Sequence, residues 1–287
     1  MNRWVLGARP RTLPAAVVPV AVGAGAAVGV GDPVWWRVAL ALVVSLALQV
    51  GVNYANDYSD GVRGTDEVRV GPARLVGGGL ATPSAVKRAA FLSFGVALLA
   101  GGVLVVAVGP ELIPVGVAAV AAAWFYTGGP RPYGYLGLGE VFVFLFFGLV
   151  ATAGTTYVVA EQLTALAVIA GSGVGALACA LLAVNNLRDI LTDEVSGKKT
   201  VAVRLGDRRA RHFYNALVGA SFVAVIGCAF VRPWALLGLA ALPLALPAVR
   251  VVRSGATGRQ LIAALAATGR LQMAYGVALG VGLALGG

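Results

Sequence analysis

Long apolar stretches alternate with short polar segments along the whole chain. The apolar stretches cover approximately residues 12–31, 37–56, 86–108, 112–127, 139–158, 163–187, 212–230, 234–250 and 262–285. An α-helix needs about 20 apolar residues to cross the hydrocarbon core of a bilayer, where lipid cannot satisfy free backbone groups. The pattern therefore predicts an all-α polytopic membrane protein with about nine transmembrane helices, and we expect residues 1–287 to form one intramembrane domain.

The composition supports this interpretation and excludes other classes of protein. Hydrophobic residues make up 59% of the 287 positions and charged residues only 12%, about half the fraction usual in soluble domains. A soluble globular enzyme, a disordered tail and a fibrous protein are excluded. The first apolar stretch is not expected to be a cleavable signal peptide, because it is too long and Arg9 and Arg11 lie at its start.

The basic residues fall almost entirely on one set of alternate loops. The chain has a formal net charge of +10, and 20 of its 22 Lys and Arg residues lie on this set, with Arg37 and Arg232 as the exceptions. The positive-inside rule then predicts that the N-terminus and the two long polar loops, 57–85 and 188–211, are cytoplasmic. The positive charge is thus explained by membrane topology, and no nucleic-acid partner is expected.

Acidic and amide residues are clustered where the second apolar stretch reaches the cytoplasmic side. Asn53, Asn56, Asp57 and Asp60 are spaced at i, i+3, i+4 and i+7. This spacing puts all four on one face of a helix.

A second cluster follows the sixth apolar stretch. Asn185, Asp189 and Asp193 repeat at i, i+4 and i+8, which again predicts one helical face over two turns. A shift of 132 residues superimposes Asn53 on Asn185 and Asp57 on Asp189. The chain is therefore expected to have two related halves, each with the same Asn and Asp pattern at a corresponding helix end.

Carboxylates on one face near a low-dielectric boundary repel one another and are rarely found there without partners. Oxygen-rich clusters suit Mg²⁺, which proteins usually hold through one or two carboxylates together with the phosphates of a substrate. A single Asp-x-x-x-Asp is equally compatible with an ordinary solvated helix end. Two such faces, each preceded by Asn, favour a site that clamps a diphosphate through bridging metal ions.

The two loops also supply cations next to the acids. These are Arg63, Arg69 and Arg74 after the first cluster, and Lys198 and Lys199 after the second. Arg and Lys stabilise the negative charge that develops on a departing diphosphate. The positive-inside rule would place some of these residues there in any case, so each is either a phosphate contact or a topological signal.

The motifs resemble those of the UbiA-type intramembrane prenyltransferases. The resemblance rests on Asn53-x-x-x-Asp57-x-x-Asp60 with Asp66, and on Asp189-x-x-x-Asp193, and it covers nearly the whole chain. Several longer segments are most similar to the 1,4-dihydroxy-2-naphthoate polyprenyltransferases of that family. They are Ala8-Arg9-Pro10-Arg11-Thr12-Leu13, Asn56 to Gly61, Arg69-x-Gly71-Pro72-x-Arg74, Asn185 to Ile190 and Gly197 to Gly206.

The resemblance implies a fold, a reaction and a set of site residues. Members of the family have nine transmembrane helices around a central cavity and transfer prenyl groups from polyprenyl diphosphates to aromatic acceptors with Mg²⁺. Transfer to 1,4-dihydroxy-2-naphthoate, with loss of CO₂ and diphosphate, gives demethylmenaquinone in menaquinone biosynthesis. By this match, Mg²⁺ and the diphosphate are held by Asn53, Asp57, Asp60, Asp189 and Asp193.

The roles of several further residues stay open at this stage. Asp66 lies beyond two glycines, off the helix, and binds either a metal ion or the aromatic acceptor. Tyr126 either faces the allylic cation through its ring or belongs to an interfacial tyrosine belt. Arg131, Lys198 and Lys199 are alternative partners for the carboxylate of the acceptor, and Asn185 is a candidate substrate contact.

Two other functions compete with this prediction. The nearest is prenyl transfer to another aromatic acceptor, such as 4-hydroxybenzoate, a chlorin or a haem. A secondary transporter also fits two related halves with polar residues, but transporters have their sites near the bilayer midplane on broken helices. Here the acids lie at cytoplasmic helix ends beside the two largest loops, which favours chemistry on a lipid substrate.

Overall fold

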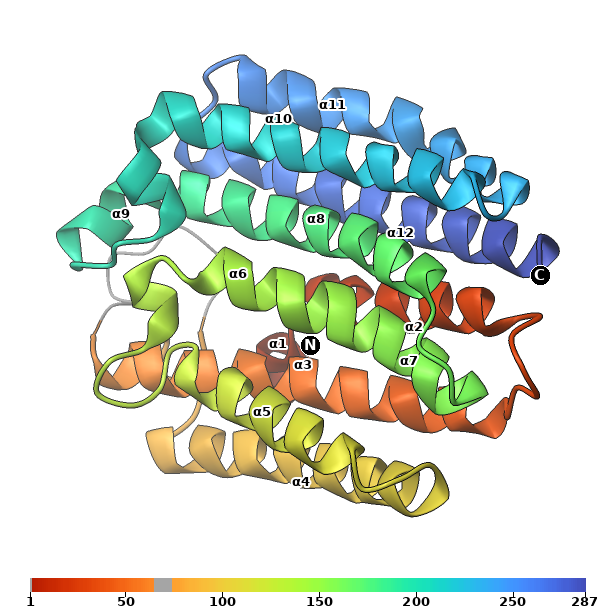
Figure 1. Ribbon diagram of the computed structural model, residues 1–287. Coiled ribbons are helices and arrows are strands. Elements are labelled where there is room, and N and C mark those ends of the chain that lie inside the picture. The colour runs from red at the N-terminus through yellow and green to blue at the C-terminus, as the bar shows by residue number, and fades with distance from the viewer. Residues whose placement is uncertain (1, 65–73) are drawn as a thin grey trace.

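The structure is a computed structural model that describes residues 2–64 and 74–287. Every regular element of this described part is helical, and the long helices run roughly side by side along one direction (Figure 1). The α-helices are α1 (Arg3–Ala8), α2 (Pro14–Ala27), α3 (Trp36–Val62), α4 (Pro83–Ala107), α5 (Leu112–Phe125), α6 (Gly139–Val143), α7 (Ala151–Ala160), α8 (Ala165–Arg188), α9 (Ile190–Val195), α10 (Val201–Ala229), α11 (Leu242–Arg253) and α12 (Leu261–Leu285). The prediction of an all-α membrane protein is confirmed.

The expected number of nine spans is not confirmed. Within the described residues, seven helical segments are long and apolar enough to cross a membrane. The helices α2 and α5 are apolar but have only 14 residues each, or about 21 Å at 1.5 Å per residue, which is shorter than the hydrocarbon core. The apolar stretch at 12–31 is longer than α2 because it includes Gly29 and Gly31, whose positive φ angles of 68° and 53° lie beyond the helix end.

The polar segment 188–211 is largely helical, whereas the sequence predicts a long loop. It contains α9 and the first turns of α10, which begins at Val201 after the Thr200 side chain accepts a hydrogen bond from the Val203 N–H. Gly206, with φ 72° and ψ 163°, interrupts the helical geometry inside α10. The first turns of α10 are rich in charged residues because they lie outside the apolar region of the bundle. They therefore have no apolar pattern that would predict a helix.

The helices of the bundle are arranged in layers. In Figure 1, α4 and α5 lie at one edge, followed by α3, then α2 with α6 and α7, then α8 with α12, and finally α10 with α11. The largest buried apolar cluster joins α8, α10 and α12, for example through Leu177, Tyr214 and Tyr275. A smaller cluster around Phe94 joins α3 and α4.

A π-helical segment, Phe144–Val150, connects α6 to α7 and packs closely on α8. A Cβ atom on Gly148 would lie 2.6 Å from the Cα of Gly175 and 2.8 Å from the carbonyl oxygen of Gly171. Only glycine at position 148 permits this approach. Such π-helical insertions are often found at functional sites, and this one lies beside the cavity described below.

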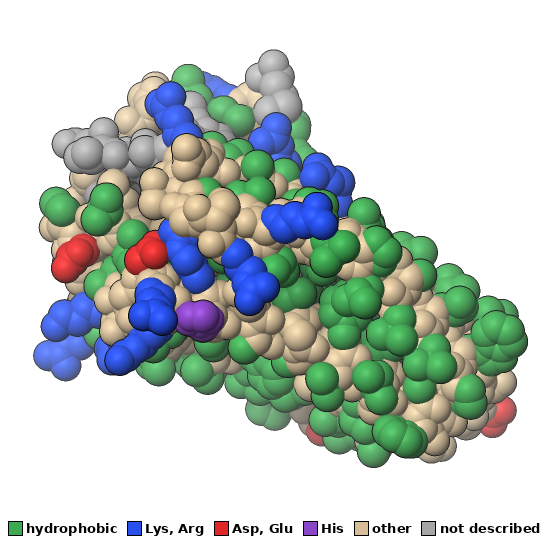
Figure 2. Space-filling model, turned by 90° about the horizontal axis from the view of Figure 1, so that it is seen from above, with side chains coloured by type: hydrophobic (Ala, Val, Ile, Leu, Met, Phe, Trp, Pro, Cys, Tyr) green, Lys and Arg blue, Asp and Glu red, His purple; other side chains and the backbone are tan. Residues whose placement is uncertain are grey.

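The charged side chains are distributed unevenly over the molecule. Figure 2 shows Lys and Arg side chains gathered at one end of the visible face, whereas the rest of that face is mostly hydrophobic. This is the end at which α3 and α8 finish. A protein with seven long apolar helices and an apolar outer surface is an integral membrane protein.

Arg37 and Arg232, the two basic residues outside the main set of loops, bind helix ends at the end of the bundle that lies away from the other Lys and Arg residues. Arg37 and Arg232 are each 7% exposed. The Arg37 guanidinium donates to carbonyls at the ends of α4 and α7 and forms an ion pair with Glu161, at 2.7 Å. The Arg232 guanidinium donates to the carbonyls of Gly25, Val28 and Leu283, at 3.2, 2.5 and 2.7 Å. These carbonyls lie at or near helix ends, where the carbonyls run out of regular helical partners, so both arginines act as caps.

Candidate functional site

One cavity of about 1550 Å³ is lined by residues of α2 to α8 and α12. Most of the predicted site residues lie in its wall. The predicted residues that line it are Asn53, Asp57, Asp60, Arg74, Tyr126, Asn185, Asp189, Asp193 and Lys198. In the described chain, Arg63, Arg131 and Lys199 are not among the lining residues. Asp66 and Arg69 lie outside the described residues. The structure thus brings the two acidic clusters, 132 residues apart, to the wall of one cavity.

The first cluster lies on one continuous helix, as predicted. Asn53, Asn56, Asp57 and Asp60 all belong to α3, are at most 9% exposed and line the cavity. The hydroxyl group of Thr127 donates to the Asn56 Oδ1 atom at 2.8 Å. The helical spacing therefore does bring these side chains to one surface.

Asp57 also holds the polypeptide that follows the first cluster. Its Oδ2 atom accepts a hydrogen bond from the Leu75 N–H at 3.0 Å, and its Oδ1 atom accepts one from the Val76 N–H at 3.2 Å. The residue is 1% exposed, and Leu75 is fully buried. Asp57 therefore fastens the backbone at Leu75 and Val76 to α3.

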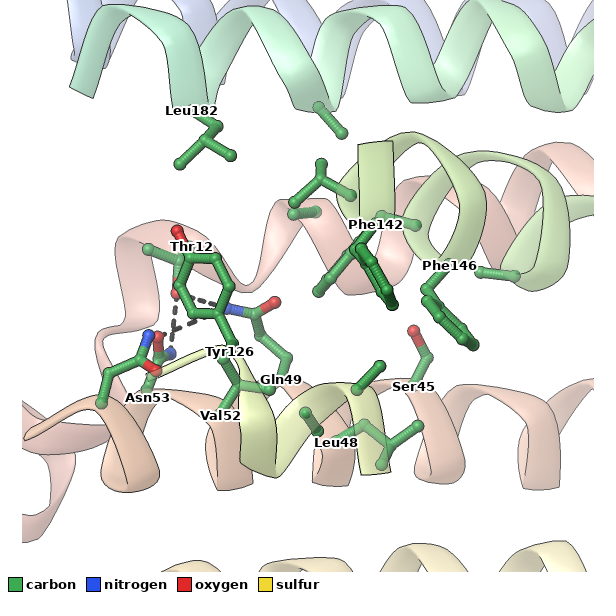
Figure 3. A pocket seen from close by; sticks show the side chains of 18 of the residues that line it. Thr12, Ser45, Leu48, Gln49, Val52, Asn53, Tyr126, Phe142, Phe146 and Leu182 are labelled. Carbon is green, nitrogen blue, oxygen red and sulfur yellow. Dashed lines mark hydrogen bonds between the residues drawn. The ribbon is translucent and has the colours of Figure 1, made fainter. Parts of the chain in front are cut away.

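Asn53 connects α3 to the N-terminal segment of the chain. Its Nδ2 atom donates to the Ala8 carbonyl and to the Thr12 hydroxyl, both at 2.9 Å. Gln49 also donates to Thr12, at 3.1 Å (Figure 3). The backbone carbonyl of Asn53 accepts from Arg9 at 3.3 Å. These contacts fix the N-terminal segment at the rim of the cavity, whereas metal binding by Asn53 stays a prediction.

The second cluster is not on one uninterrupted helix. The helix α8 ends at Arg188, and Asp189 has a non-helical φ of −96° and ψ of 7° before α9 begins. The helix is therefore interrupted within residues 185–193, but the N–H groups of Asp189 and Asp193 still donate to the carbonyls four residues earlier, and Asn185, Asp189 and Asp193 all line the cavity. The break lets Arg188 bind its neighbour Asp189 with two hydrogen bonds, of 2.7 and 2.5 Å. Asn185 and Asp193 line the cavity on either side of this pair.

A tyrosine and a lysine connect the two clusters across the cavity. Tyr135 donates from its hydroxyl to the Asp60 Oδ1 atom at 2.6 Å, and the same atom lies 3.4 Å from Lys198 Nζ. The Lys198 ammonium also lies 4.6 Å from the centre of the Tyr135 ring. Burial lowers the pKa of Lys198, but the charges of Asp60 and Asp193 and the contacts with Tyr135 outweigh it, so the net shift is upward. Lys198 is therefore a protonated cation at neutral pH.

The other predicted cations have different positions. Arg63 donates to the carbonyls of Thr127 and Gly129, which ties the end of α3 to the loop after α5. Arg131 and Lys199 are exposed, and the Lys199 N–H donates to the carbonyl of Tyr135 at 2.9 Å. Their roles as substrate contacts stay predictions.

Tyr126 lies at the end of α5 with its side chain against the cavity. Burial raises the pKa of its hydroxyl, and Glu140, Tyr133, Asp60 and Asp193 add to the shift. The hydroxyl is therefore neutral at physiological pH. Its ring is available to a positively charged group in the cavity, which favours the catalytic interpretation over an interfacial belt.

An aromatic row continues from Tyr126 along the cavity wall. The ring centres of Tyr126 and Tyr133 are 5.5 Å apart, those of Tyr133 and Phe142 are 4.0 Å apart, and those of Phe142 and Phe146 are 6.2 Å apart. Figure 3 shows the polar group of Asn53, Gln49 and Thr12 beside Tyr126, with Phe142 and Phe146 farther along. The cavity thus changes from polar to apolar along its length.

The apolar part of the cavity is elongated. Its lining follows α3 from Ala41 to Val52, which corresponds to roughly 17 Å at 1.5 Å per residue. Val44, Leu48 and Val52 line this stretch. The arrangement suits a substrate with a charged head and a hydrocarbon tail.

The charge balance of the polar end was not predictable from the acidic motifs alone. The lining includes four Asp residues and six basic residues, the latter being Arg9, Arg11, Arg74, Arg188, Lys198 and Arg270. Arg9, Arg11, Arg188 and Arg270 are not predicted as site residues, although the first three belong to segments that carry the family resemblance. Asn186 also belongs to such a segment, whereas Tyr135 and Glu140 have no sequence signal that distinguishes them from neighbouring residues.

The donor set fits Mg²⁺ that arrives with a phosphate ligand. In the part of the chain that the structure describes, no group of three or more His, Cys, Asp and Glu side chains is close enough to hold a metal ion by itself. Mg²⁺ commonly uses only one or two carboxylates and completes its shell with water and substrate phosphates. The oxygen donors of the two Asp pairs match that requirement, and the excess of cations matches a diphosphate.

Known proteins with similar sequences and structures agree with this description. The sequence model of the UbiA prenyltransferase family matches residues 16–268. The chain is 50% identical to the 1,4-dihydroxy-2-naphthoate octaprenyltransferase of Mycobacterium tuberculosis over 284 residues, covering 99% of this chain and 97% of that protein. It is 36% identical to the enzyme of the same name from Escherichia coli over 236 residues, covering 77% and 74% of the two chains.

Solved structures share the fold. A UbiA homologue from Archaeoglobus fulgidus bound to GPP and Mg²⁺ has a TM-score of 0.70 and 16% identity, covering 97% of this chain and 99% of that one. The apo structure of a UbiA homologue from Aeropyrum pernix K1 has a TM-score of 0.72 and 14% identity, covering 96% and 98%. The matches in sequence and fold extend over nearly the whole chain, which therefore belongs to the UbiA prenyltransferase family.

Proposed function

We propose that the protein transfers a polyprenyl group from polyprenyl diphosphate to 1,4-dihydroxy-2-naphthoate, with release of diphosphate and CO₂. The product is the reduced form of demethylmenaquinone, which belongs to menaquinone biosynthesis. The observation that carries the proposal is the single cavity that combines two Asp pairs, six basic residues and an apolar extension. The naphthoate acceptor is supported by the names of relatives that are 50% and 36% identical to this chain.

In this proposal the polar end binds the diphosphate. Asp57, Asp60, Asp189 and Asp193 hold Mg²⁺, which, when bound, neutralises charge on the diphosphate and makes it a better leaving group. Lys198 and Arg74 contribute positive charge at the same end of the cavity. Because Arg188 already pairs with Asp189, this arginine also limits the repulsion between the acids before substrate binds.

The reaction then needs an allylic cation that is protected from water. The carbon–oxygen bond to the diphosphate breaks, and its electron pair leaves with the diphosphate. The ring of Tyr126 faces the resulting cation, and the apolar wall excludes water. The ring carbon that bears the acceptor carboxylate forms the new carbon–carbon bond. The bond to the carboxylate then breaks, CO₂ leaves, and its electron pair restores the aromatic ring.

We further propose that residues 1–287 act as one domain in the cell membrane, with the N-terminus and the polar end of the cavity in the cytoplasm. The asymmetric distribution of 20 of the 22 basic residues supports this orientation. A cytoplasmic site would give a water-soluble acceptor access, while the prenyl tail stays among the apolar helices.

The test is a transfer assay with the purified protein in lipid nanodiscs. We expect radiolabelled polyprenyl diphosphate to label 1,4-dihydroxy-2-naphthoate, and carboxyl-labelled acceptor to release one equivalent of CO₂ per product. Parallel reactions contain 4-hydroxybenzoate, and Asp189→Ala serves as the inactive control. Transfer to 4-hydroxybenzoate but not to the naphthoate would reject the proposed acceptor, and no transfer to either would reject the proposed reaction.

A further inference from the structure

A buried carboxylate and an amide form a pair beside the cavity that the reaction described above does not use. Glu140 lies in the first turn of α6 and is 6% exposed, and Asn186 lies near the end of α8 and is 8% exposed. The Asn186 Nδ2 atom donates to the Glu140 Oε1 atom at 3.0 Å. Asn186 lines the cavity, whereas Glu140 lies behind it.

This pair fixes which end of the Asn186 amide faces the cavity. The Asn186 amide nitrogen donates to a carboxyl oxygen of Glu140, so the nitrogen end of the amide faces Glu140. Among the described residues, the Asn186 Oδ1 atom accepts no hydrogen bond, yet it is not one of the polar atoms buried without a partner. Because the exposed part of this buried residue lies on the cavity wall, the carbonyl oxygen points into the cavity.

The surroundings of this oxygen match a flat ring that carries a hydroxyl group. A Cβ atom built on Gly139 would lie 3.7 Å from the Tyr126 hydroxyl oxygen and 3.3 Å from a methyl group of Leu182, so all three residues meet there. In Figure 3, Leu182 points from α8 toward Tyr126. Leu182 precedes Asn186 by one helical turn, on the same face of α8. The region thus offers an aromatic face, an aliphatic contact and one fixed hydrogen-bond acceptor.

We propose that Asn186 accepts a hydrogen bond from a ring hydroxyl of the aromatic acceptor, and that Glu140 is the positioning residue that keeps the Asn186 carbonyl turned toward it. The inference rests on the proposed function and adds a basis for acceptor specificity. A site built to bind a hydroxyl group disfavours an analogue without one, since a polar atom is then left unpaired. The same bond polarises the O–H bond, with the proton remaining on the ring oxygen, and so raises the electron density of the ring.

The first test compares the naphthoate acceptor with its two mono-O-methyl ethers in steady-state kinetics. For the wild type we expect kcat/KM to fall at least about 10-fold for one of the ethers. In Asn186→Leu, the KM for the acceptor should rise about 10-fold, this discrimination should disappear, and the KM for polyprenyl diphosphate should be unchanged. Glu111→Gln changes an acid to an amide at the opposite end of the bundle and is the control for the Glu140→Gln variant described next. It should behave as the wild type.

The second test separates positioning from simple structural support. In Glu140→Gln, the new amide can both donate and accept, so the Asn186 carbonyl is no longer held and discrimination should fall. Adding Glu140→Gln to Asn186→Leu should cause no further loss, because Glu140 acts through Asn186. The exchange variant Glu140→Gln/Asn186→Asp keeps one carboxylate and one amide. It also keeps an acceptor oxygen toward the cavity, which now belongs to a carboxylate instead of an amide. It should recover most of the discrimination and unfold in detergent at about the wild-type temperature.

Several results would overturn the inference. Discrimination that persists in Asn186→Leu shows that the hydroxyl binds elsewhere. A rise in the KM for polyprenyl diphosphate or in the Mg²⁺ requirement, with the KM for the acceptor unchanged, assigns Asn186 to the diphosphate site. Failure of the exchange variant to recover discrimination removes the positioning role of Glu140. These results are distinct from failure of the proposed function, in which the wild type transfers no prenyl group to the naphthoate.

Discussion

Asp57 binds two backbone N–H groups in the structure and is a proposed Mg²⁺ ligand, and the substitution Asp57→Asn changes both properties. The carboxylate accepts hydrogen bonds from the backbone N–H groups of Leu75 and Val76, at 3.0 and 3.2 Å. An amide has only one oxygen, so its NH₂ group would face one of these N–H donors. The variant therefore loses one charge-assisted bond, worth about 1.5–3 kcal/mol, in addition to a metal-binding oxygen.

This free energy predicts how often the segment after the first acidic cluster opens. When opening is fast relative to cleavage, the rate of proteolysis follows the population of the open form. A loss of about 1.5–3 kcal/mol then raises this population roughly 10- to 100-fold. Trypsin cleaves after Arg74, directly before the fully buried Leu75, so the peptide bond between them reports the opening.

The assay is limited trypsin digestion in detergent, with the cleavage at Arg74 followed by mass spectrometry. We expect cleavage of Asp57→Asn to be at least about 10-fold faster than cleavage of the wild type, and prenyl transfer to be lost. Asp207→Asn is the matched control, since Asp207 pairs with Arg211 on α10 and does not contact the segment. Equal cleavage rates in the two variants would show that Asp57 does not hold the segment, and the reasoning would be wrong.

Three further outcomes are expected. Tyr135→Phe removes the 2.6 Å hydrogen bond to Asp60 and should lower kcat/KM about 10-fold. Tyr157→Phe, at the opposite end of the bundle, should leave kcat/KM unchanged, and equal activity of both variants would contradict a role for this bond. Arg232→Met removes the guanidinium donor from three carbonyls at the ends of α2 and α12, a loss of about 3 kcal/mol or more. The unfolding temperature of this variant in detergent should therefore lie well below that of Arg253→Met. Removal of divalent cations with EDTA should abolish transfer and added Mg²⁺ should restore it; full activity after chelation would reject the metal-dependent mechanism.

The sequence was a reliable guide wherever one physical rule acted locally. Apolar length predicted the seven long helices of the described residues, because lipid forces the backbone to form its hydrogen bonds within each helix, but it did not predict that α2 and α5 are short. The i, i+3, i+4, i+7 spacing of the first cluster predicted a common face, and α3 provides it without interruption. The second cluster also lines the cavity, but the sequence did not predict that α8 ends before Asp189.

Long-range contacts were beyond the reach of the sequence. Arg63 has the side chain and the sequence position expected of a phosphate ligand, yet it binds the carbonyls of Thr127 and Gly129. Glu140 is not predicted as a site residue, and its contact with Asn186, 46 residues away, is visible only in the structure. Periodicity describes neighbours on one helix, whereas these contacts depend on how separate helices meet.

The sequence alone determined that this chain is an α-helical membrane protein, which end of the bundle carries the positive charge, and that two acidic motifs belong to a UbiA-type site. These properties follow from hydrophobic length, charge asymmetry and local spacing, which are encoded residue by residue. Only the tertiary structure decided which cations enter the cavity, where the second motif breaks and which end of the Asn186 amide faces Glu140. Those properties are set by packing and by hydrogen bonds between distant segments, whose partners no local pattern specifies.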